Sequence, residues 1–133
     1  MTANARAELL RGAPYFPVPD VAAAGEHYRS MLGFECEYIA GDPPLFAIYS
    51  RNGAPIMLRR VDQPGLISPN ERQGGTWDVF FWVNDVMALH AELAAAGATI
   101  VHDPVVQPYG MKLFAVRDPN GYVLGFGQTH RET

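Results

Sequence analysis

Four histidines and one cysteine are the side chains of this chain best suited to acid-base, nucleophilic or metal chemistry. His27 and His90 fall within helical patterns and His130 lies in a polar tail, so we interpret each as an ordinary packed or exposed histidine. His102 differs because it stands beside Asp103 at the end of a strand pattern. For His102 we consider a ligand contact, as an acid, base or donor, and a place on the rim of a site.

The cysteine content and the charge limit the function classes that the chain supports. Cys36 is the only cysteine and forms neither an internal disulfide nor a thiolate cluster, so we interpret it as a small core residue in a reducing compartment. Ten Lys and Arg against 14 Asp and Glu give a net charge of −4 without a basic run, which argues against nucleic acid as a partner. We find no apolar signal segment and no stretch of about 18 apolar residues, so we expect a cytoplasmic protein without a membrane span.

A repeat of about half the chain organises its 133 residues. The sequence Val18-Pro19-Asp20-Val21 precedes a helical pattern that ends at Gly33, and Val83-Asn84-Asp85-Val86 precedes a second pattern that ends at Gly97. In both copies the aspartate can cap the start of a helix and the glycine can take a positive φ at its end. The length, with 48% hydrophobic and 18% charged residues, predicts one compact domain over residues 1–133.

Segments of strand pattern surround the two predicted helices. They cover residues 14–18, 34–39, 45–50 and 55–60 in the first half, and residues 78–83, 99–102, 112–117 and 122–127 in the second. Asn52-Gly53 and Asp118-Pro119-Asn120-Gly121 supply turn signals for the last hairpin of each half. We therefore predict an α+β fold with βαβββ modules at residues 12–61 and 77–128, joined by a polar linker at residues 62–76.

With this repeat and the Asp118-Pro119-Asn120-Gly121 turn, residues 12–128 resemble the vicinal oxygen chelate superfamily of glyoxalases, bleomycin-resistance proteins and extradiol dioxygenases. Residues 107–121, with Pro108, Tyr109 and Gly110 ahead of the final hairpin, are most similar to the bleomycin-resistance branch. The resemblance implies eight strands curled into a cup with the helices outside. It also implies a homodimer in which the second copy completes the pocket.

Metal-dependent members of that superfamily carry His, Gln or Glu ligands at four strand positions. The resemblance places these positions at Ala13, Met57, Asp78 and Gly125. Only Asp78 could hold a metal, and a lone carboxylate holds a divalent cation weakly. We therefore expect no metal and no cofactor.

Strand alternation sorts the remaining candidates, because neighbouring side chains point to opposite faces of a sheet. The helix-facing set is continuously apolar: Phe16, Val18, Ile56, Leu58, Tyr122, Leu124 and Phe126. The predicted ligand-binding set consists of cup-facing residues, His102 and two residues of the loop before the final hairpin: Tyr15, Met57, Arg59, Asp78, Phe80, Trp82, His102, Tyr109 and Met111. Gly125 and Gly127 on the cup side are expected to leave room for a ligand.

Alternatives remain open for several of these residues. Tyr15, Phe80 and Trp82 could pack on one another as ordinary core, and Tyr109 and Met111 could belong to a plain surface loop. Asp78 needs a partner among aromatic side chains, and the candidates are Arg59 and a cationic ligand.

The leading hypothesis is a metal-free protein that binds a small aromatic or amphipathic molecule, antibiotics included, between two subunits, with no catalytic residue. The acidic balance favours a cationic ligand. The alternative is a metal-dependent lyase or dioxygenase of the same superfamily, or a metal-free enzyme that uses Asp78 or His102 as a general base.

Overall fold

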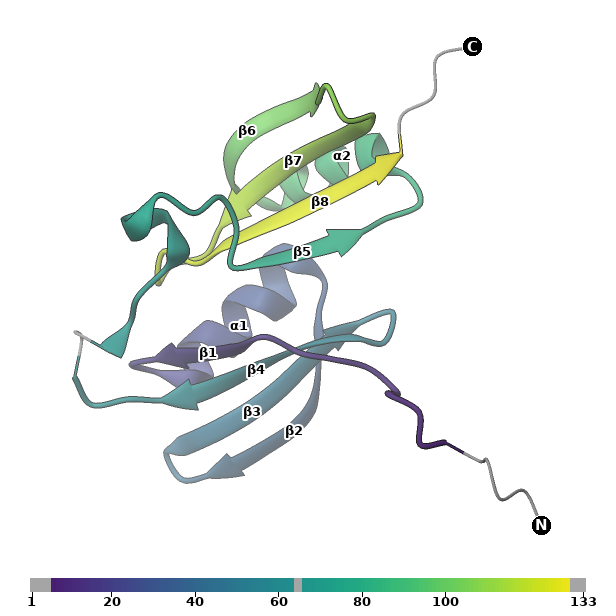
Figure 1. The fold of residues 1–133 in the computed structure, drawn as a ribbon. Coiled ribbons are helices and arrows are strands. Elements are labelled where there is room, and N and C mark those ends of the chain that lie inside the picture. Colours follow the sequence, from purple (N-terminus) through teal and green to yellow (C-terminus); the bar gives the residue numbers. More distant parts are fainter. Residues whose placement is uncertain (1–5, 64–65, 130–133) are drawn as a thin grey trace.

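The computed structural model describes residues 6–63 and 66–129, which form two modules of the same element order (Figure 1). The first module contains β1 (Tyr15–Val18), α1 (Val21–Leu32), β2 (Glu35–Gly41), β3 (Pro44–Arg51) and β4 (Ala54–Arg60). The second contains β5 (Val79–Trp82), α2 (Val86–Ala96), β6 (Thr99–Val106), β7 (Met111–Arg117) and β8 (Val123–Thr129). This confirms the predicted α+β fold with two βαβββ modules.

The two helices begin and end where the repeat predicts. The side chains of Asp20 and Asp85 each accept a hydrogen bond, from the amides of Ala23 and Ala88 at 3.0 Å. The helices end at Gly33 and Gly97, whose φ values of 73° and 94° are readily reached without a Cβ.

Each module folds its strands into one sheet of its own. The first sheet has the order β1-β4-β3-β2 and the second has the order β5-β8-β7-β6. In both sheets the first strand runs parallel to the last, and the other pairs are antiparallel. Figure 1 shows each helix against its own sheet, α1 with the first and α2 with the second, so each sheet keeps one face without a helix.

One hydrophobic core runs through both modules. All seven residues of the predicted helix-facing set are buried in it, which confirms the predicted strand faces. The rings of Phe16 and Tyr122 stack across the module boundary at 4.3 Å between centroids. The hydroxyl of Tyr122 donates to the carbonyl of Pro17 at 2.7 Å, and the hydroxyl of Tyr28 donates to the carboxylate of Asp118 at 2.7 Å. The modules are therefore joined by polar contacts as well as by apolar packing.

The structure corrects three local predictions. Strand β6 continues to Val106 instead of ending at His102, and a register shift between His102 and Val105 accommodates the proline in this edge strand. The segment predicted as a plain linker contains a short 3₁₀ helix, η2 (Asn70–Gln73). Cys36 is exposed on edge strand β2 and is not a core residue. No helix in residues 6–63 or 66–129 is long and apolar enough to cross a membrane.

Candidate functional site

The helix-free face of the first sheet carries several apolar side chains and one arginine. We call it the first open face and define it by residues that cross-strand register places together: Tyr15, Pro17, Tyr38, Phe46, Ile48, Met57 and Arg59. The ring of Phe46 lies 6.1 Å from that of Tyr15 and 6.2 Å from that of Tyr38, between ring centroids. Tyr15 is 53% exposed and Tyr38 is 55% exposed, so this aromatic row is open to solvent in the single chain.

The helix-free face of the second sheet carries a tighter aromatic row. We call it the second open face and define it by Trp77, Phe80, Trp82, His102, Leu113, Gly125 and Gly127. The centroid of Phe80 lies 4.7 Å from that of Trp77 and 5.1 Å from that of Trp82. The row changes from half-buried at Trp77 to 77% exposed at Trp82. Part of the predicted packing among aromatic residues is therefore present, and one end of the row remains open.

The glycines of β8 do not leave the empty space that the sequence suggested. A Cβ atom at Gly125 would lie 2.7 Å from the indole of Trp77 and 2.8 Å from the ring of Phe80. A Cβ atom at Gly127 would lie 2.7 Å from the ring of Phe80. The two glycines allow the aromatic rings to lie directly on the backbone of β8, so a ligand would contact the rings and not the strand.

Asp78 has a different partner from either candidate. Its two carboxylate oxygens accept hydrogen bonds from the backbone amides of Asn70 and Val123, each at 2.8 Å. These contacts hold the start of β5 against η2 and against the start of β8. Asp78 therefore has a structural role in this chain, and the guanidinium of Arg59 is not its partner.

The other predicted residues lie at the margins of the second open face. His102 is opposite Ala115 in the register, and its Nδ1 lies 2.9 Å from the carbonyl oxygen of Asp103, to which it donates. Tyr109 is 65% exposed at the tip of the β6–β7 hairpin, and Met111 opens β7 half-buried. The predicted set is thus divided between two faces, with Tyr15, Met57 and Arg59 on one and the remaining residues on or beside the other.

The other histidines lie away from both open faces. His90 is 3.0 Å from the carboxylate of Asp103, and its ring packs edge-on against Phe114 at 5.1 Å. His27 is half-buried on α1, where burial lowers its pKa. His130 lies outside the described residues.

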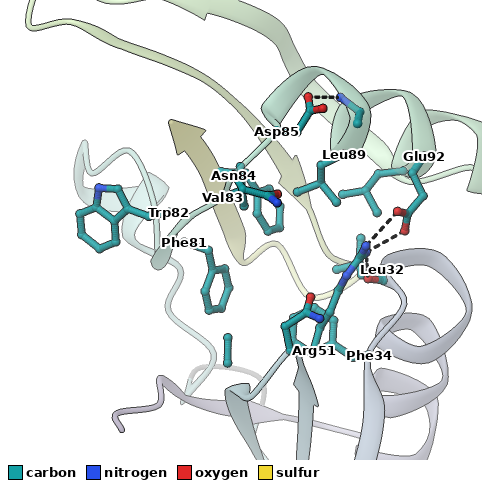
Figure 2. Close-up of a pocket in the computed structure, with 15 residues that line it drawn as sticks. Leu32, Phe34, Arg51, Phe81, Trp82, Val83, Asn84, Asp85, Leu89 and Glu92 are labelled. Atoms are coloured by element: carbon teal, nitrogen blue, oxygen red, sulfur yellow. Dashed lines mark hydrogen bonds and ion pairs between the residues drawn. The ribbon is translucent and has the colours of Figure 1, made fainter. Parts of the chain in front are cut away.

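A cavity of about 560 Å³ lies between the modules on the helix side (Figure 2). Apolar side chains such as Phe34, Phe81 and Leu89 line it, and an ion pair between Arg51 and Glu92 at 2.7 Å crosses its edge. Of the predicted site residues, Trp82 alone reaches this cavity, and Figure 2 shows its ring turned away from the other lining residues. A smaller hollow of about 320 Å³ brings Tyr15 and Asp78 together at the junction of β1 and β5.

Comparison with known proteins identifies the family of the chain. Residues 12–126 match the family model of the glyoxalase/bleomycin resistance protein/dioxygenase superfamily. The chain belongs to this superfamily. No curated protein sequence matches it.

Several solved structures share the fold of this superfamily member. TioX from Micromonospora sp. ML1 is 25% identical, with a TM-score of 0.71 over 90% of this chain and 98% of its own. A bleomycin-binding protein from Streptomyces verticillus, solved with copper(II)-bleomycin, is 27% identical, with a TM-score of 0.67 over 96% of this chain and 100% of its own. A glyoxalase-related enzyme from Clostridium phytofermentans has a TM-score of 0.74 over 92% of this chain and 97% of its own, but at 14% identity it shows only the fold.

The residues of this superfamily member do not fit the metal of its metal-dependent relatives. At the four positions that the resemblance assigns to metal ligands, Ala13, Met57 and Gly125 have no nitrogen or oxygen donor in their side chains. The fourth, Asp78, already accepts backbone hydrogen bonds with both oxygens. Within the described ranges no other group of three His, Cys, Asp or Glu residues is placed to hold a metal ion.

The sequence interpretation missed three aromatic residues of the open faces. Phe46 and Tyr38 follow the same alternation that selected Met57, and extending that alternation to β3 and β2 would have found them. Trp77 stands just before the predicted strand, where alternation gives no direction. Its position over Gly125 becomes visible only in three dimensions.

Proposed function

We propose that this superfamily member binds a planar aromatic small molecule, without a metal and without catalysis, at a site formed by two copies of the chain. The observation that carries the proposal is the pair of aromatic rows, on the first and second open faces, whose exposed ends no described part of the same chain covers. Aromatic side chains favour stacked or edge-on contacts with flat ligands, and their large area makes such contacts strong.

The division of the site between two sheets supports the involvement of a second copy. Both helix-facing sides of the sheets share one core, so the two open faces lie on the sides away from it. One chain therefore presents two half-sites. Two copies related by a twofold axis can place the first open face of one beside the second open face of the other, twice over.

The similarity to ligand-binding relatives supports a binding role over an enzymatic one. The Streptomyces verticillus relative was solved with copper(II)-bleomycin and is described as a bleomycin-binding protein. The donor-poor residues at Ala13, Met57 and Gly125 support a metal-free site in this chain. A cytoplasmic location and the absence of a nucleic-acid partner stay predictions from the sequence.

A titration with the neutral planar probe 1-pyrenemethanol tests the proposal. We expect saturable quenching of tryptophan emission with the probe, because Trp77 and Trp82 lie in the second open face. Phe80→Ala should weaken binding about tenfold, the equivalent of about 1.4 kcal/mol of lost ring contact. Met87→Ala, on the exposed side of α2, is the matched control and should leave the dissociation constant unchanged.

Two further measurements complete this test. Dialysis against EDTA should leave probe binding unchanged, and sedimentation should give a particle of twice 14.6 kDa. Absence of saturable binding, or binding that requires a stoichiometric metal, would contradict the proposed function. A monomer that binds the probe with full affinity would contradict the two-copy site.

A further inference from the structure

We propose that the ligand carries an anionic group and that Arg59 on the first open face receives it. The inference rests on the proposed function and specifies the ligand class of the same site. It reverses the expectation of a cationic ligand, which depended on a free carboxylate at Asp78 and on the net charge of the chain.

Asp78 cannot act as the counter-charge for a cation while its present contacts last. Each of its oxygens accepts a backbone hydrogen bond of 2.8 Å, from Asn70 and from Val123. A cation would have to compete with both amides and loosen the start of β5. The nearby Asp103 is also engaged, since its Oδ1 lies 3.0 Å from Nε2 of His90. The second open face therefore has no uncommitted carboxylate within the part of the chain that the structure describes.

Arg59, in contrast to Asp78, has a charged group that is not engaged by another described residue. Four arginines lie on strands, and three of them form ion pairs: Arg51 with Glu92, Arg60 with Asp62, and Arg117 with Glu71. Arg59 is exposed and has no such pair with any residue in the ranges 6–63 and 66–129. It is the strand arginine whose guanidinium remains available for a carboxylate, sulfonate or phosphate group.

The surroundings of Arg59 make an anionic partner necessary once the face is covered. Its cross-strand neighbours are Pro17 and Phe46, which offer no charge. The acidic residues found near this face in the described ranges, Glu35 and Glu37, lie beside Ser50 at the other end of the sheet, about 13 Å away along the strands, and Glu37 is paired with Arg11. A ligand or second copy that covers the first open face would remove water from the guanidinium, and an unpaired buried charge is costly.

A second donor on the opposite open face also lacks an acceptor. The indole N–H of Trp77 is buried and has no hydrogen-bond partner among the described residues. A buried donor without a partner is costly, so native structures usually supply one. This N–H lies against the backbone of β8, so a ligand could reach it only if the ring moved, and the expectation of an anionic group rests on Arg59.

Three probes with one ring system separate charge from stacking: 1-pyrenesulfonate, 1-pyrenemethanol and 1-pyrenemethylamine, which is an ammonium at neutral pH. We expect the sulfonate to bind at least about tenfold more tightly than the alcohol and the ammonium to bind least tightly. Arg59→Met should reduce the affinity for the sulfonate to that for the alcohol and leave the alcohol unchanged. Arg60→Met is the matched control, because Arg60 is the next residue, points to the other face and is paired with Asp62, and it should keep the preference.

The outcomes distinguish this inference from the proposed function. Equal binding of the three probes, tighter binding of the ammonium, or a sulfonate affinity that survives Arg59→Met would overturn the anionic ligand while the aromatic site stands. Failure of all three probes to bind would overturn the proposed function, and the inference with it. Circular dichroism of Arg59→Met and Arg60→Met verifies that both variants are folded.

Discussion

Asp118, in the turn before β8, is a charged residue held by several hydrogen bonds. Its carboxylate is buried and accepts hydrogen bonds from the hydroxyl of Tyr28 at 2.7 Å and from the amides of Asn120 and Tyr122 at 2.8 and 2.9 Å. Burial raises the pKa of Asp118, and these hydrogen bonds oppose the rise. Burial, followed by the charge of Asp118, also raises the pKa of Tyr122 to about 12. Asp118 is thus a structural residue that joins α1 to the second module.

Tyr28→Phe tests the hydrogen bond that joins the modules at this residue. The variant keeps the buried ring and removes the hydroxyl donor, which leaves a buried carboxylate oxygen without its partner. We expect the free energy of unfolding to fall by about 1–3 kcal/mol. Urea denaturation followed by circular dichroism measures this change. A variant as stable as the wild type would show that the hydrogen bond contributes nothing net.

Asp118→Asn tests the raised pKa of the same residue. A carboxyl whose pKa is higher in the folded than in the unfolded chain binds its proton more tightly when folded, so its contribution to stability is lost as the pH rises through the raised pKa. The variant does not titrate. We therefore expect the unfolding free energy of Asp118→Asn, relative to the wild type, to increase from about pH 4 to about pH 7. A difference that stays constant or decreases over this range would contradict the raised pKa.

At the scale of the element, β8 is unusual because aromatic rings lie directly on its backbone. Gly125→Ala would place a methyl group 2.7 Å from Trp77 and 2.8 Å from Phe80, closer than side chains can approach. We expect displaced rings, a change in tryptophan emission and a loss of about 1–3 kcal/mol in the free energy of unfolding. Gly12→Ala is the control, because a Cβ there meets no atom within 4 Å. Unchanged emission and stability of Gly125→Ala would mean that the rings are loosely held.

The elements follow from the sequence wherever the signal is local. The capping aspartates Asp20 and Asp85, and the Asn52-Gly53 turn with φ of 52° and 78°, act within a few residues, and the structure confirms each. The contacts of Asp78 could not be predicted, because its donor Asn70 lies 8 residues before it and its donor Val123 lies 45 residues after it. The predicted length of β6 was wrong. Asp103-Pro104 is locally a turn signal, but an edge strand tolerates the proline.

For the candidate site, the sequence could predict only which residues share a strand face. Alternation identified Tyr15, Met57 and Phe80, since each strand has period two. It could not show that the two sheets pair only within their own modules, which is a property of the tertiary structure. The ligand role of these residues therefore stays a proposal.

At the scale of the whole molecule, the two modules share their core, and each donates a hydrogen bond to the other. Tyr28 of the first module reaches Asp118 of the second, and Tyr122 of the second reaches Pro17 of the first. Arg51 and Glu92 add an ion pair between β3 and α2. The two modules should therefore unfold together.

We expect a single cooperative unfolding transition. Circular dichroism reports both modules, whereas tryptophan emission reports the second one, which contains Trp77 and Trp82. Urea midpoints from the two signals should coincide, as for a two-state domain. Separate midpoints would show that each module is stable alone.

The position of Cys36 gives the native chain a convenient handle for spectroscopy. It is the only sulfhydryl in the sequence, and it is exposed on the outermost strand of the first sheet. A maleimide dye would therefore attach at one defined point without any mutation. Energy transfer between donor-labelled and acceptor-labelled chains would then report their separation, and its concentration dependence would give the strength of self-association.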